Sequence, residues 1–247
     1  MEKQTKNHAH RAPSGKAVHD IWTRQNIALV VVLALVIIFN QFEIGIVSGV
    51  AAGSASLVRA SSTNKLANGV DLRQVTSTAQ AVAAVFPIQK IKTQQDAVGM
   101  MVPTGTPEYS AAFGGISFDD PVGSLNKLSK MYPALKQKVQ TEHPEIFQRF
   151  MNLASRPVGI SCEYCCGVGP IGIDRNGNSA CGCQHNPAIL SITLGLMAST
   201  NYNDAQVLHE ALRWKALFFP RNMVGLAMDA AGGNIPGGNL PEMVGGC

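Results

Sequence analysis

The residues in this chain that are best suited to chemistry are its cysteines, and they are clustered. Five of the six cysteines lie between positions 162 and 183. The two groups read Cys162-Glu-Tyr-Cys165-Cys166 and Cys181-Gly-Cys183-Gln-His185. Each group places sulfur atoms a few residues apart, so that one tight turn can direct two thiolates at the same point. This spacing is typical of a site that binds a metal ion.

Zinc is the first choice among metals because it binds four Cys or His ligands in a tetrahedron, with Zn–S distances of about 2.3 Å. One pair from each group completes a four-sulfur site: Cys162, Cys165, Cys181 and Cys183. An iron–sulfur cluster, which also takes four cysteines, and Cu(I), which prefers thiolates, are the alternatives. Further candidates extend the full set of predicted ligands to Cys162, Cys165, Cys166, Cys181, Cys183 and His185.

Two local elements are expected to assemble this site. Between the cysteine groups, Asn176-Gly177 is flanked by short apolar runs, which predicts a β-hairpin that brings the groups together. After them, Asn186-Pro187 begins a predicted helix. The positive N-terminal end of that helix faces back toward Cys183 and His185, where it stabilises thiolate charge.

Disulfides and redox-active thiols are the competing interpretations of the cluster. Outside the cytoplasm, oxidation is permitted, and bridges across the hairpin would give a disulfide-stapled scaffold protein. A membrane-tethered thiol–disulfide oxidoreductase would use Cys162 with Cys165, or Cys165 with Cys166. No βαβ pattern of the thioredoxin kind surrounds the Cys-x-x-Cys group. The sequence therefore favours a metal-binding protein without a catalytic role, whose function is structural, metal-carrying or electron-transferring.

The order of these features resembles the membrane-tethered PCYCGC-motif proteins over residues 143–219. The matching residues are His143-Pro144-Glu145, Cys162 to Gly167, Cys181-Gly182-Cys183, His185 and Asn186. The chain differs in its Cys-x-x-Cys-Cys order, where that motif has Cys-x-Cys-x-Cys. The resemblance implies a metal-binding extracytoplasmic domain.

Composition and charge exclude several classes of protein. Hydrophobic residues make up 46% of the 247 residues and charged residues 15%, which excludes an intrinsically disordered chain. The first 26 residues carry a net charge of +3 and the other 221 only +1, so no nucleic-acid partner is expected. A single long apolar run excludes a polytopic membrane protein.

That apolar run predicts a membrane anchor. The aliphatic stretch Ile27–Phe39 extends into a helix over residues 26–47, long enough to cross a bilayer, with Trp22 as an interfacial anchor. Basic residues precede the run, so the N-terminus is expected in the cytoplasm and the C-terminal domain outside the cell membrane. An uncleaved signal anchor is favoured over a cleaved signal peptide, whose small-residue cleavage site would have to lie as late as Ala51–Ala55.

A face of small residues follows the apolar run. Gly45, Gly49 and Gly53 recur every four residues, a spacing that lets two helices approach closely. This face is either a site of homo-oligomerisation or part of a flexible Gly/Ala/Ser tether.

The predicted fold class is mainly α: one transmembrane helix followed by an α-rich ectodomain that contains a Cys-rich β-hairpin. The predicted parts are a cytoplasmic polar tail (1–25), a transmembrane signal anchor (26–47), a small-residue linker (48–68), a helix with an irregular segment (69–123), a helical domain with the cysteine cluster (124–231) and a Gly/Pro-rich tail (232–247). Ectodomain helices are expected to begin near Asp71, Ser124, Pro144, Pro187 and Asn203, and Pro133 is expected to kink or divide the second. Cys247, after the Gly-rich tail, is not expected to be a ligand.

The charge asymmetry generates a first prediction, on topology. A reporter enzyme that works only after export, fused after Val70, is expected to be active in cells. A reporter that works only in the cytoplasm is expected to be silent at the same position. Activity of the cytoplasmic reporter there would contradict the predicted orientation.

Overall fold

A computed structural model describes residues 71–232 and 240–246 of the chain. The chain divides into two units, Met1–Ala52 and Gly53–Cys247, and every described residue belongs to the second. The predicted signal anchor, the glycine face and Cys247 lie outside the described residues. Within the described ranges, no helix has both the length and the apolar character that crossing a bilayer requires.

The described part of the chain is mainly α-helical, which confirms the predicted class. Its α-helices are α3 (Thr78–Val85), α4 (Gln94–Met101), α5 (Pro121–Glu142), α6 (Pro144–Ala154), α7 (His185–Ser199), α8 (Asp204–Phe218) and α9 (Pro220–Ala230). Three short 3₁₀ helices precede or separate them: η1 (Leu72–Gln74), η2 (Ile88–Lys90) and η3 (Ser110–Phe113).

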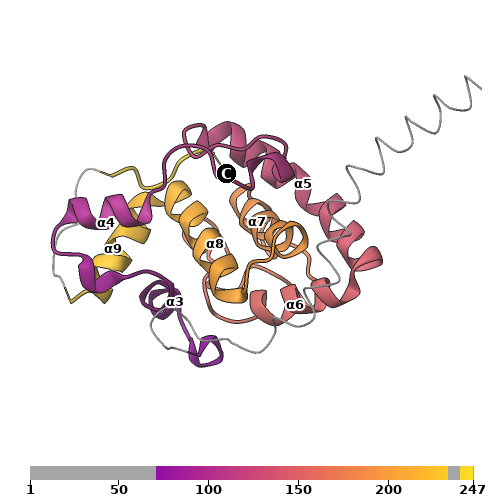
Figure 1. The fold of residues 1–247 in the computed structure, drawn as a ribbon, viewed down its shortest axis with the longest axis horizontal. Helices are drawn as coiled ribbons and strands as arrows, with labels where there is room; N and C mark the ends of the chain where they lie inside the picture. The colour runs from indigo at the N-terminus through magenta and orange to yellow at the C-terminus, as the bar shows by residue number, and fades with distance from the viewer. Residues whose placement is uncertain (1–70, 233–239, 247) are drawn as a thin grey trace, which may run out of the picture. The chain divides into compact units, whose positions relative to one another are not determined.

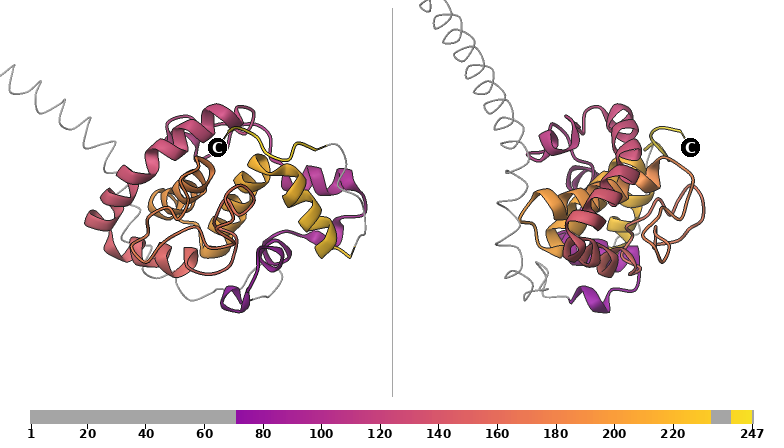
Figure 2. Two further views of the ribbon diagram at one scale, coloured as in Figure 1. Left: turned by 180° about the vertical axis from the view of Figure 1, so that it is seen from behind. Right: turned by 90° about the vertical axis from the view of Figure 1, so that its right-hand side faces the viewer.

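Helix α8 lies between two groups of helices (Figure 1). On one side α7 packs against α5, α6 and α8, and on the other α9 packs against α3, α4 and α8. The rear view in Figure 2 shows the same arrangement, with α7 and α8 next to each other. The cysteine-bearing segment between α6 and α7 is therefore attached to the first group, at the N-terminal end of α7.

Capping residues explain where several helices begin. The Asn203 side chain accepts a hydrogen bond from the backbone N–H of Gln206, and the Asn203 backbone N–H donates one to the Gln206 side chain, a capping box that starts α8 as predicted. Pro144 occupies the first turn of α6, also as predicted. Helix α5 starts earlier than expected, because Asp120 rather than Ser124 is its N-cap. Pro133 lies inside α5 and does not divide it.

Other predicted boundaries are wrong. The helix expected to begin near Asp71 is interrupted: Asp71 caps only η1, and Ser77 caps α3. Helices α4 and α9 were not predicted; α4 begins at a capping box formed by Thr93 and Asp96. The predicted β-hairpin of the cysteine segment is not supported, since the described residues contain no strand there but only isolated bridges.

A buried polar network attaches the segment around η3 to α8. The Glu210 carboxylate accepts hydrogen bonds from the Tyr109 hydroxyl at 2.7 Å and from the Arg213 guanidinium at 2.9 Å. Trp214 donates to the Tyr109 hydroxyl at 3.0 Å. Burial by itself would raise the pKa of Glu210, but hydrogen bonds, including one from His209, lower it to about 2. The carboxylate is therefore charged and satisfied inside the core.

Helix α7 is the central element of the core. Every residue from Ala188 to Met197 is buried, so this helix is covered on all faces. Its buried hydroxyls are satisfied: Ser191 donates to the carbonyl of Leu128, and Thr193 to that of Ile189. An element enclosed in this way is a rigid support for whatever its first turn holds.

The close approach of α7 to η3 generates a second prediction. A Cβ atom at Gly195 would lie 2.4 Å from Cε1 of the buried Phe113 ring, so Gly195→Ala is expected to overpack the core. We expect a loss of about 1–3 kcal/mol in the free energy of unfolding, measured by urea denaturation. Gly225→Ala is the matched control: it is also helical, has nothing within 4 Å of the added Cβ, and should stabilise by up to about 1 kcal/mol. Equal stability of the two variants would contradict this packing.

Candidate metal centre

The cysteine cluster lies in a segment without helices between Ala154 and His185. Two isolated bridges organise it, a parallel one between Ile160 and Ile171 and an antiparallel one between Ile173 and Ser179. The Asp174 carboxylate stabilises the turn between Ile173 and Ser179, because it accepts hydrogen bonds from the backbone N–H groups of Asn176 and Asn178, both at 2.8 Å. The chain thus reverses at the predicted turn without forming strands.

Four cysteine sulfurs lie together after this reversal. The Sγ atoms of one group are all within 4.8 Å of one another: Cys162, Cys166, Cys181 and Cys183. Cys166 and Cys181 are joined by a disulfide, and Cys162 Sγ lies 3.0 Å from Cys166 Sγ. The preferred four-sulfur set of the sequence contained Cys165 in place of Cys166. The vicinal pair Cys165-Cys166 explains the difference, because spacing alone does not tell which of two adjacent side chains points to which neighbour.

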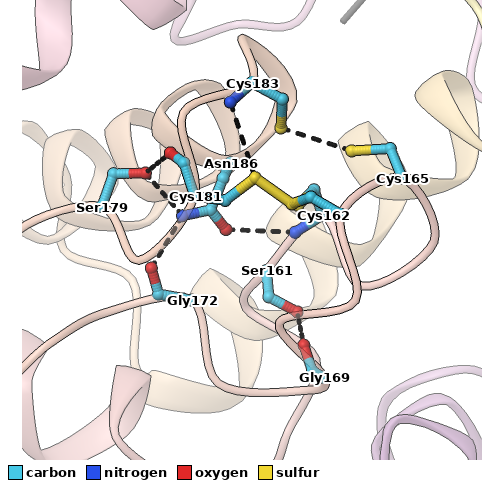
Figure 3. Close-up of a disulfide and its surroundings, with 10 residues drawn as sticks. Ser161, Cys162, Cys165, Gly169, Gly172, Ser179, Cys181, Cys183 and Asn186 are labelled. Carbon is cyan, nitrogen blue, oxygen red and sulfur yellow. Dashed lines mark hydrogen bonds between the residues drawn. A yellow bond between two sulfur atoms is a disulfide. The ribbon is translucent and has the colours of Figure 1, made fainter.

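Cys165 belongs to a second group with Cys183 and His185. The ligand atoms of these three residues also lie within 4.8 Å of one another, and Cys165 Sγ is 3.3 Å from Cys183 Sγ. Figure 3 shows Cys183 between Cys165 and the disulfide. The structure therefore brings all six predicted ligand side chains into two groups that share Cys183.

Asn186, in the first turn of α7, connects the two halves of the segment (Figure 3). Its side-chain carbonyl accepts a hydrogen bond from the backbone N–H of Cys162 at 3.1 Å. Its amide nitrogen donates to the carbonyl of Gly172 and to the hydroxyl of Ser179, both at 2.7 Å. A single buried amide thus uses the rigid helix α7 to hold both cysteine-bearing loops.

His185 is the first residue of α7 and is fully buried. Its Nε2 atom lies 2.9 Å from the backbone carbonyl of Val244, in the C-terminal segment. A carbonyl only accepts hydrogen bonds, so Nε2 carries a proton in this contact and Nδ1 is the ring atom left for a metal ion. The N–H of Val244 in turn bonds to the carbonyl of Phe218. Residues 240–246 therefore return to the site, which the sequence did not predict.

A buried ion pair supports the first cysteine loop. Lys215 of α8 is fully buried, and its Nζ atom lies 2.5 Å from Glu163 Oε2 and 3.1 Å from the carbonyl of Gly159. Thr78 of α3 donates to the same carboxylate oxygen at 2.7 Å. Glu163 adopts a left-handed conformation, with φ of 46°, between Cys162 and Tyr164. The pair ties the Cys162–Cys165 turn to two helices.

Sequence reasoning missed Lys215, although a signal for it exists. Lys215 follows Leu208, Ala211 and Leu212 at helical spacing, on the stripe that packs into the core. A charged residue on such a stripe is buried only when a partner is available. The Val244 contact has no comparable signal, because it depends on where the C-terminal segment lies.

The pKa values of Cys183 and Cys162 are shifted in opposite directions by their surroundings. A hydrogen bond with Cys162, a second with the His185 side chain and a third from the backbone N–H of Asn186 lower the pKa of Cys183 far below its usual range, against the effect of burial. The same bond with Cys183, together with burial, raises the pKa of Cys162. Cys183 is thus the thiolate of the pair, beside the N-terminus of α7, as expected for the helix that follows it.

No family model, curated protein sequence or solved structure matches this chain. The residues of the cluster themselves indicate its chemistry: cysteine sulfurs, one oriented imidazole, and a rigid helix next to them.

The bridging role of Asn186 generates a third prediction. Asn186→Asp retains the acceptor for Cys162 but loses both donated hydrogen bonds and adds charge beside a thiolate. We expect the free energy of unfolding to fall by about 2–4 kcal/mol in urea denaturation. Asn176→Asp, at an exposed position of the nearby turn, is the control and should change it by less than about 0.5 kcal/mol. Similar stability of both variants would show that the amide does not hold the loops.

Proposed function

We propose that this is a metal-binding protein whose centre is built by the cysteine cluster, with a structural, metal-carrying or electron-transferring role. The observation that carries the proposal is the convergence of five sulfurs and one imidazole in two groups, each within 4.8 Å. Cysteine sulfurs that are not in the disulfide and an imidazole are ligands that soft and borderline metal ions prefer. Zinc is the first choice, and an iron–sulfur cluster or copper are the alternatives.

Exposure differs across the cluster and bears on its role. Cys162 and His185 are buried, whereas Cys166 is exposed at the outer edge. A metal held here would be anchored from inside by rigid elements and approached from solvent on one side. This arrangement suits either a structural ion at the surface of the domain or transfer of an ion to a partner.

A thiol–disulfide oxidoreductase is the second candidate, because Cys162 Sγ lies 3.0 Å from Cys166 Sγ of the bridge. In that reaction the Cys162 thiolate attacks the Cys166 sulfur, a Cys162–Cys166 bond forms, and Cys181 leaves as the thiolate. Two observations put it second. The pKa of Cys162 is raised, which disfavours the attacking thiolate. The described residues also lack the strands of a thioredoxin-like βαβ unit.

The proposed location is extracytoplasmic, on a single-pass anchor at residues 26–47. Support comes from the sequence: an apolar run of sufficient length, basic residues before it, and the resemblance to membrane-tethered PCYCGC-motif proteins. The bilayer is the proposed partner of that segment, and Gly45, Gly49 and Gly53 are the proposed contact for a second copy.

Metal removal gives the fourth prediction. Protein purified anaerobically is expected to contain stoichiometric zinc, iron or copper by elemental analysis, and a chelator is expected to lower its Tm steeply, because the site does not exist in the unfolded chain. Cys183→Ser, which removes the residue common to both groups, should lose the metal. Cys247→Ser, at a position that the sequence does not predict to be a ligand, should keep it. If disulfides alone held the loops, the chelator would leave Tm unchanged and a reductant would lower it.

A further inference from the structure

The disulfide removes two members of the cluster from the set of metal ligands. The metal-binding form of cysteine is the thiolate, and Cys166 and Cys181 share their sulfurs in a covalent bond. The four-sulfur group of Cys162, Cys166, Cys181 and Cys183 would thus bind a metal only after reduction. With the bridge in place, the remaining candidate ligands of the cluster number four, the count that zinc requires.

We propose that one metal ion is bound by Cys162, Cys165, Cys183 and His185, while the Cys166–Cys181 disulfide holds the two loops together beside it. This inference rests on the proposed function, metal binding at the cluster, and deepens it by naming the ligands. It makes the bridge and the metal parts of one site that are present at the same time.

Three of these ligand atoms, from Cys165, Cys183 and His185, already lie close enough together for a single ion. Cys165 Sγ lies 3.3 Å from Cys183 Sγ, and the His185 ligand atom is within 4.8 Å of both. Cys162 Sγ is also within 4.8 Å of Cys183 Sγ. Two sulfurs on a tetrahedral zinc ion with Zn–S distances of about 2.3 Å lie about 3.8 Å apart. Cys183 belongs to both groups, and Cys162, which is grouped with Cys183 but not with Cys165 and His185, would supply the fourth ligand.

His185 is already oriented as a ligand. Metal-binding histidines usually donate their second ring N–H to a carbonyl or carboxylate, which fixes the tautomer. Here Nε2 donates to the carbonyl of Val244 at 2.9 Å, and this leaves Nδ1 as the atom that can coordinate. The side chain is also enclosed by the rings of Phe218 and Phe219, at centroid distances of 5.5 and 4.9 Å.

Positive potential is directed at two of the proposed cysteine ligands. The backbone N–H of Asn186, at the start of α7, points to Cys183, and the Lys215 ammonium interacts electrostatically with Cys162. Cys162 is buried, whereas Cys166 is exposed to solvent. The buried side of the cluster therefore holds Cys162 and His185, and the bridge reaches solvent at Cys166.

The adjacent cysteines 165 and 166 provide a matched test. The full-length protein is purified without reductant, loaded with zinc, and examined by elemental analysis and by mass spectrometry of non-reduced peptides. We expect one zinc per chain together with an intact Cys166–Cys181 bridge. Cys165→Ser should bind zinc at least about tenfold more weakly, measured by competition with a chromogenic chelator. The double variant Cys166→Ser/Cys181→Ser should retain one zinc with less than a threefold change in affinity.

Every other outcome would overturn either the proposed ligand set or the proposed function. Zinc that binds the wild-type protein only after reduction, or loss of zinc from the double variant, would overturn the ligand set and leave the proposed metal-binding function standing. Unchanged affinity in Cys165→Ser would do the same. If the double variant does not fold, a non-chelating reductant added to the zinc-loaded wild-type protein replaces it, and zinc must remain bound. Absence of zinc, iron and copper from every form would overturn the proposed function itself.

Discussion

The first turn of α7 is the constraint on which the cluster depends. Loops rich in cysteine and glycine carry little apolar surface of their own, so they need an external support to hold several sulfurs at one point. Asn186 provides it through hydrogen bonds to Cys162, Gly172 and Ser179. The support is rigid because α7 is buried on every face. Its first turn therefore fixes the positions of the two loops.

The buried pair of Lys215 and Glu163 is a second support, with a different energetic character. Placing an ammonium group in the core carries a desolvation cost of several kcal/mol, which the attraction of a paired carboxylate offsets in part. Glu163 is further satisfied by Thr78, and Lys215 by the carbonyl of Gly159. Such a pair adds little net stability, but it specifies one position for the turn that carries Cys162 and Cys165. A metal site requires ligand atoms that are held in defined positions.

Oxidation and metal binding are usually treated as alternatives for clustered cysteines, because both consume thiolates. This cluster has enough sulfurs for a disulfide and a metal site to be present together. Two cysteines form the bridge at the exposed edge, and Cys162, Cys165, Cys183 and His185 remain as candidate ligands. The C-terminal segment completes the arrangement by fixing the tautomer of the imidazole through Val244. The candidate centre thus combines four parts of the chain: the two cysteine loops, the start of α7, and residues near the C-terminus.

The residues of the candidate site and the helical class could be predicted from the sequence. Cysteine spacing identified all six clustered side chains, and local signals such as Asn203 and Pro144 located helix starts, because capping depends on residues within one turn. Three features became visible in the folded chain alone: which sulfurs are neighbours, that Cys166 rather than Cys165 is bonded to Cys181, and that Val244 contacts His185. These features depend on contacts between residues far apart in the chain, or on which of two adjacent side chains faces inward. Spacing along a sequence does not encode such choices; packing against α7 and α8 makes them.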